Sequence, residues 1–181
     1  MSAIRTIQQV IAAKPAMDGD GVNILRTASN LLDPFLMIDE LHSAQPLVNG
    51  FPSHPHRGME TLTYMREGGF EHRDHMGNRG EIGPNSAQWM SAGRGVIHSE
   101  LPLAGHGGLH GFQLWINLPA AQKMQDLDYA QLDRVPQLTH NGVIARAIAG
   151  QWQLGEQTLA SGLDRLAAQA RVLCVELPPQ S

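Results

Sequence analysis

The stretch that decides the fold reads Gly93-Arg94-Gly95-Val96-Ile97-His98-Ser99-Glu100. A second motif, His54-Pro55-His56, lies about forty residues earlier. In each motif, two side chains that can bind a metal stand two residues apart. Because alternate residues of a β-strand point to the same face, each pair can face one site. We therefore predict that two strands bring His54, His56, His98 and Glu100 together.

The segments around both motifs are short and are separated by glycine and proline. Residues 35–38 are all apolar and predict a buried strand. Further on, Phe112, Leu114 and Ile116 alternate with other side chains, which predicts a strand with two distinct faces. Many short strands joined by turns are typical of a β-sandwich or barrel, and we predict an all-β fold.

The pattern changes after Pro119. Residues 120–124 predict a short helical turn, and residues 143–150 predict a strand. Residues 159–173 have helical spacing, with their leucines on one face. We predict one metal-binding barrel over residues 1–120, followed by a truncated or divergent unit over residues 121–181, in which the fold of residues 150–181 stays open.

Composition limits the function. The chain has 181 residues, a net charge of -4 and one cysteine, Cys174. The charges form no basic stripe for nucleic acid, and no run reaches the roughly 18 apolar residues of a membrane helix. The lone cysteine fits a reducing compartment. We expect a cytoplasmic protein that contacts neither nucleic acid nor membrane directly, with Cys174 as an inert buried thiol.

Three imidazoles and one carboxylate suit a divalent transition metal. We predict one such ion held by His54, His56, His98 and Glu100, with Fe(II) foremost and Ni, Mn, Co, Cu or Zn as alternatives. Positions left open on the ion would receive substrate or O2.

The chain resembles the pirin family of cupins over about residues 30–125. The resemblance rests on these stretches: Asp33-Pro34-Phe35, His54-Pro55-His56-Arg57-Gly58, Glu71-His72-Arg73-Asp74, Gly77-Asn78, Gln88-Trp89-Met90-Ser91-Ala92-Gly93-Arg94-Gly95, His98-Ser99-Glu100 and the run from His110 to Pro119. It implies a jelly-roll barrel whose single metal, usually iron, is bound by the four residues named above. It also implies one of two functions, because several bacterial pirin-like proteins open quercetin with O2 and mammalian members are described as nuclear transcriptional cofactors.

Two features depart from the family. The chain has Asp39-Glu40-Leu41-His42 where pirins usually have an Asp-x-Phe-Gly type sequence. From about Gly150 the sequence no longer follows the family, whose members carry a second cupin unit there.

We expect a metal-dependent dioxygenase that opens a flavonol with O2, in which Glu100 serves as the base. His110 and Gln113 are the candidates to line the substrate cavity. The alternative is a non-enzymatic iron-binding module that senses redox state and contacts a protein partner. A shortened family member without activity is a third reading.

Other polar residues have plainer interpretations. His72, Asp74 and His75 could form a second metal site, but we favour exposed loop residues. Glu60 stands where many cupins place a glutamate ligand, and we do not count it as one, because two carboxylates would make an open Fe(II) site too anionic.

Overall fold

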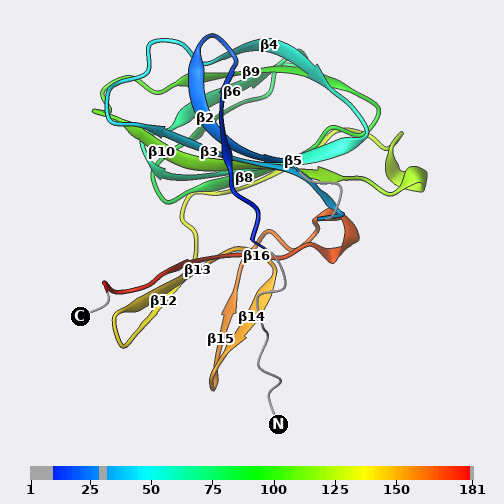
Figure 1. Ribbon diagram of the computed structural model, residues 1–181. Helices are drawn as coiled ribbons and strands as arrows, with labels where there is room; N and C mark the ends of the chain where they lie inside the picture. The colour runs from blue at the N-terminus through cyan, green and yellow to red at the C-terminus, as the bar shows by residue number, and fades with distance from the viewer. Residues whose placement is uncertain (1–9, 29–31, 180–181) are drawn as a thin grey trace.

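The computed structural model describes residues 10–28 and 32–179. Two facing β-sheets form its larger part, drawn in the upper half of Figure 1. The larger sheet has the strand order β1-β2-β3-β10-β5-β8-β11 and the smaller one β4-β9-β6-β7. The strands of the larger sheet are β1 (Lys14–Asp18), β2 (Val22–Ala28), β3 (Phe35–Ser43), β10 (Leu109–Asn117), β5 (Met59–Glu67), β8 (Ala87–Ser91) and β11 (Asp128–Leu132). Those of the smaller sheet are β4 (Phe51–His56), β9 (Val96–Pro102), β6 (Phe70–Asp74) and β7 (Arg79–Ile82).

The predicted all-β architecture is confirmed, and so are its two best-marked strands. Residues 35–38 open β3, and the alternating residues Phe112, Leu114 and Ile116 lie on β10. All strand pairs of both sheets are antiparallel. No helix of the described residues is long and apolar enough to cross a membrane.

A smaller unit lies against the outer face of the larger sheet (Figure 1). It contains a sheet of β12 (Gln137–His140), β13 (Val143–Ala149) and β16 (Val172–Glu176), and a hairpin of β14 (Gln151–Leu154) and β15 (Gln157–Ala160). The predicted strand at residues 143–150 is therefore confirmed. The predicted turn after Pro119 is also present, as the short 3-10 helix η1 (Ala120–Gln122).

The helix expected over residues 159–173 is wrong. This segment contains the end of β15, an extended stretch, the 3-10 turn η2 (Ala167–Gln169) and the start of β16. Its leucines are buried, but they belong to two different core clusters: Leu159 packs in one, and Leu163 and Leu166 pack in the other. Ala168 and Gln169 also have positive φ values of 53° and 55°, which a right-handed helix cannot include.

The main apolar core lies between the larger sheet and the smaller unit. Leu62, Leu114 and Ile116 contribute from the sheet, and Leu163 and Leu166 from the smaller unit. Strands β5 and β10 therefore have two occupied faces, one against this core and one toward the space between the two facing sheets.

Strand β11 lies beyond Pro119 in sequence, yet it pairs with β8 at the edge of the larger sheet. Residues 128–132 thus belong structurally to the larger part. The domain boundary at residue 120 stays a prediction.

Candidate metal centre

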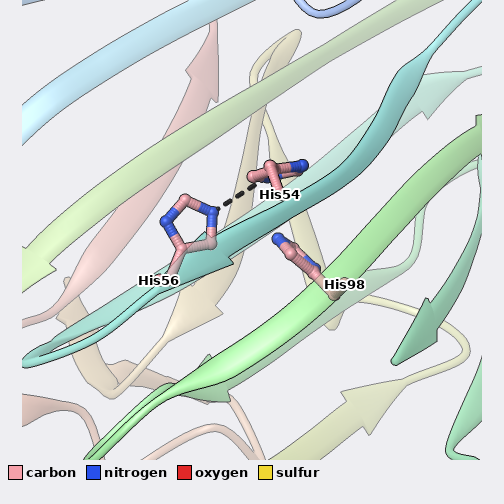
Figure 2. Close-up of side chains that lie close together, drawn as sticks. All are labelled: His54, His56 and His98. Atoms are coloured by element: carbon pink, nitrogen blue, oxygen red, sulfur yellow. Dashed lines mark hydrogen bonds between the residues drawn. The ribbon is translucent and has the colours of Figure 1, made fainter. Parts of the chain in front are cut away.

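Strands β4 and β9 bring three histidines together (Figure 2). His54 lies directly opposite His98 in the antiparallel ladder, and His56 follows two residues later on the same face of β4. Pro55 and Ile97, which alternate with these residues, are exposed. One potential ligand atom from each histidine lies within 4.8 Å of the others. The same-face argument from the sequence therefore holds for the three imidazoles.

The hydrogen bonds around the trio show which nitrogen of His54 faces the other imidazoles. Nδ1 of His54 donates to the carbonyl oxygen of Pro52 at 2.7 Å, so Nε2 of a neutral His54 carries the lone pair. This Nε2 forms a 3.0 Å hydrogen bond with Nε2 of His56 (dashed line in Figure 2), and a cation that binds both nitrogens would take the place of this bond. The ligand atoms of the trio are close enough together for one ion to be held by them.

His98 adds the clearest indication of a ligand. Its Nε2 atom is buried and has no hydrogen-bond partner among the residues that the structure describes. A buried polar atom without a partner is costly and calls for an explanation. A metal ion bound by the trio would provide one, and the donor set fits a divalent transition metal.

Burial keeps two of these imidazoles neutral. It lowers the pKa of His56 to about 4, with the nearby His54 adding to the effect. It lowers the pKa of His98 to about 2, and the neighbouring histidines His54, His72 and His56 lower it further. Neutral imidazole is the form that binds a metal, so both residues are ready to bind at neutral pH.

Glu100 also points inward from β9, and its side chain is buried. Its Oε2 accepts a hydrogen bond of 2.8 Å from the side-chain amide of Gln113, and its Oε1 accepts one of 3.4 Å from the hydroxyl of Thr63. Burial raises the pKa of Glu100, although these bonds act in the opposite direction. The 4.8 Å group contains only the three imidazoles. The roles of Glu100 as ligand and base therefore stay predictions.

The two predicted substrate residues of β10 have different surroundings. Gln113 joins the site, because it bonds to Glu100 and accepts a 3.3 Å hydrogen bond from the indole Nε1 of Trp115. His110 instead forms a 3.0 Å contact with Glu40 on the neighbouring strand β3. The structure thus brings Gln113, but not His110, next to Glu100.

The side chain of Glu60 does not face the trio, because it lies on the face of β5 that is turned toward the smaller unit. Its Oε2 accepts a 2.8 Å hydrogen bond from the backbone N–H of Ala167, and burial raises its pKa. Thr63, which has the opposite parity on this strand, contacts Glu100. Glu60 therefore links the larger sheet to η2.

The interpretation of His72 as an exposed loop residue is wrong. His72 lies on β6, is only 2% exposed, and its ring packs against that of His98. The alternation of Phe70, His72 and Asp74 on a short strand is a signal that could have placed His72 inward. His75 lies just beyond β6 and is exposed, as predicted.

Two facing antiparallel sheets, with a histidine trio between them that could hold a metal, define a jelly-roll protein of the cupin class. A family model described as Pirin matches residues 20–116, which is just over half of the chain. The chain belongs to the pirin family.

Individual relatives agree with this assignment. A Vibrio cholerae protein whose name proposes quercetin 2,3-dioxygenase activity is 47% identical over 182 residues, covering 96% of this chain and 64% of that protein. A crystal structure of quercetin 2,3-dioxygenase from Acinetobacter baumannii matches with a TM-score of 0.72 and 29% identity, covering 90% of this chain and 60% of that one. A bacterial pirin from Escherichia coli, solved in complex with nickel(II), shares the fold at a TM-score of 0.56 and 22% identity, covering 93% of this chain and 96% of that one.

The chain is shorter than many of its relatives. It spans between 58% and 66% of the length of three curated proteins that it matches.

Proposed function

We propose that this protein is an Fe(II)-dependent dioxygenase that opens a flavonol such as quercetin with O2. The observation that carries the proposal is the convergence of three inward imidazoles beside a buried carboxylate–amide pair, Glu100 and Gln113. The names of the V. cholerae and A. baumannii relatives supply the reaction and the substrate class.

His54, His56 and His98 would hold the ion, and Glu100 is the fourth candidate ligand. A bound divalent metal would lower the pKa of a substrate hydroxyl and offer open positions for substrate and O2. The same ligands also accept Ni, Mn, Co, Cu or Zn. The donor set alone therefore does not select iron, and the choice of Fe(II) is part of the proposal.

The protein's own groups prepare the substrate. The Glu100 carboxylate would take the proton of the flavonol 3-hydroxyl, which leaves an electron-rich enolate for reaction with O2. Gln113 holds Glu100 at 2.8 Å and is itself oriented by Trp115. The ring of His56 packs edge-on against Trp115, with their centroids 5.1 Å apart, so this network also supports the trio. Both atoms of O2 would enter the ring-opened product, C3 and its oxygen would leave as carbon monoxide, and Glu100 would return the proton to the new carboxyl group of the product.

The direct test is O2 consumption by Fe(II)-loaded protein with quercetin, measured with an oxygen electrode. His98→Ala serves as the control, because it removes one imidazole, and thermal unfolding checks that the variant is folded. Quercetin without protein gives the rate of its spontaneous oxidation. We expect uptake and carbon monoxide release from the wild type only. A folded, iron-loaded wild type that consumes no O2 above the spontaneous rate would overturn the proposal and favour the regulatory module with a protein partner.

A further inference from the structure

Three residues outside the trio form a continuous chain of hydrogen bonds that ends on His98. The hydroxyl of Tyr129, on β11, donates to Oδ2 of Asp74 at 2.7 Å. Nε2 of His72, on β6, lies 3.2 Å from the same hydroxyl oxygen. Nδ1 of His72 lies 3.3 Å from Nδ1 of His98. Residues from three strands, β6, β9 and β11, thus meet behind one imidazole of the site.

The chemistry of these groups fixes the direction of every bond. A carboxylate only accepts, and a phenol has a single hydrogen, so the hydroxyl of Tyr129 donates a hydrogen bond to Asp74 and accepts one from Nε2–H of His72. A buried, neutral His72 then carries its lone pair on Nδ1 and accepts from Nδ1–H of His98. The lone pair of His98 is left on Nε2, which is buried and has no hydrogen-bond partner among the described residues.

The far end of the chain is firmly anchored. Oδ1 of Asp74 accepts from the backbone N–H groups of Met76 and Asn78, each at 2.9 Å, and Oδ2 accepts from the Asn78 side chain at 2.7 Å. Asp74 is therefore fixed by the β6–β7 turn, whether or not Tyr129 is present. Because Asp74 is fixed, it determines the direction of the Tyr129 hydroxyl, which in turn determines the tautomers of His72 and His98.

We propose that Asp74, Tyr129 and His72 are positioning residues that hold His98 as its Nδ1–H tautomer and so present Nε2 to a metal ion. The inference rests on the metal site of the proposed function. It goes further, because it assigns a role to three residues outside the histidine trio. Groups that orient metal-binding histidines in this way affect metal affinity by about 10- to 100-fold when they are removed.

The first experiment reads the tautomers directly in metal-free protein, by proton–nitrogen correlation spectra of the imidazoles at neutral pH. We expect His98 as Nδ1–H and His72 as Nε2–H. Tyr129→Phe removes the acceptor of His72 and should give mixed tautomers at both rings. The matched control is Tyr64→Phe, because the Tyr64 hydroxyl is buried without a partner among the described residues, and this variant should keep the wild-type tautomers. A wild-type His98 protonated on Nε2, or unchanged tautomers in Tyr129→Phe, would overturn the proposal.

The second experiment measures Co(II) affinity by titration. His72→Leu removes the acceptor for Nδ1–H of His98 and should weaken binding by about 10- to 100-fold. His72→Asn introduces a side chain of nearly the same shape as leucine, but its amide oxygen can accept from Nδ1–H of His98. This variant should therefore keep most of the affinity that His72→Leu loses. Equal losses in both variants would mean that His72 only fills space, which contradicts the inference. If the wild type shows the expected tautomers but binds no metal, the proposed function fails and the tautomer assignment stands.

Discussion

His98 is held from two sides, by the pairing of β9 with β4 and by the imidazole of His72 on β6. Its two nitrogens therefore have different surroundings: Nδ1 has a hydrogen-bond partner, whereas Nε2 has none among the described residues. In His54 the backbone carbonyl of Pro52 plays the part that His72 plays for His98. The tautomers of two of the three imidazoles thus follow from neighbours that a metal would not contact.

Glu100 is the residue whose role is easiest to separate by substitution. Glu100→Gln keeps an oxygen that can accept from Gln113, but it removes the base. We predict that turnover of quercetin by iron-loaded protein falls by about 10²- to 10⁴-fold, the usual contribution of a positioned base. Iron affinity, measured on the same samples, should fall much less.

Equal losses of turnover and iron affinity would argue against the role as base and for Glu100 as a ligand alone. Gln113→Leu gives the complementary comparison, because it keeps the base but removes the amide that orients it at 2.8 Å.

At the scale of elements, the turn between β8 and β9 sets the position of His98. Gly93 has a φ of +47°, and a Cβ atom there would lie 2.1 Å from the carbonyl oxygen of Gln125. The carbonyl oxygen of Gly93 also accepts a 2.7 Å hydrogen bond from the backbone N–H of Gly58 at the β4–β5 turn. The two turns that flank the histidine strands are therefore joined through one glycine.

Gly93→Ala should destabilise the protein by at least about 1–3 kcal/mol, the cost of a strained backbone conformation, because the steric clash adds to it. The measurement is urea unfolding at fixed pH. Gly83→Ala is the matched control, since a Cβ atom there meets nothing within 4 Å and its backbone is not in the left-handed region. Equal stabilities of the two variants would contradict the assigned role of the turn.

The sequence predicts an element well where the local alternation of its side chains alone determines which residues face inward. The alternation in β10 and the i, i+2 pairs in β4 and β9 depend on strand geometry, and the structure has them as predicted. The spacing of Leu159, Leu163 and Leu166 also fits a helix, but contacts with two separate clusters override it. The alternation around His72 could have placed it inward, but its contact with Tyr129 could not be predicted, because Tyr129 lies 57 residues further along the chain.

On the scale of the whole molecule, the smaller unit shares an apolar core with the larger sheet that carries part of the site. Leu163 and Leu166 complete the core behind β5 and β10, whose other faces carry Thr63 and Gln113. Arg66 on β5 and Arg146 on β13 both pair with Glu176 on β16. Beyond residue 120, β11 supplies Tyr129 to the hydrogen bonds behind His98. Residues 1–120 alone would therefore lack part of the core and one support of the site.

The measurement that tests the central claim most directly is the metal content of anaerobically Fe(II)-loaded protein after removal of free iron, combined with its melting temperature. We predict one ion per chain in the wild type and a higher melting temperature than in the metal-free protein, because a ligand that binds only the folded state stabilises it. His54→Ala and His98→Ala should retain little iron and show no such rise. Equal iron content in the wild type and both variants, or a wild type whose melting temperature iron leaves unchanged, would contradict the account.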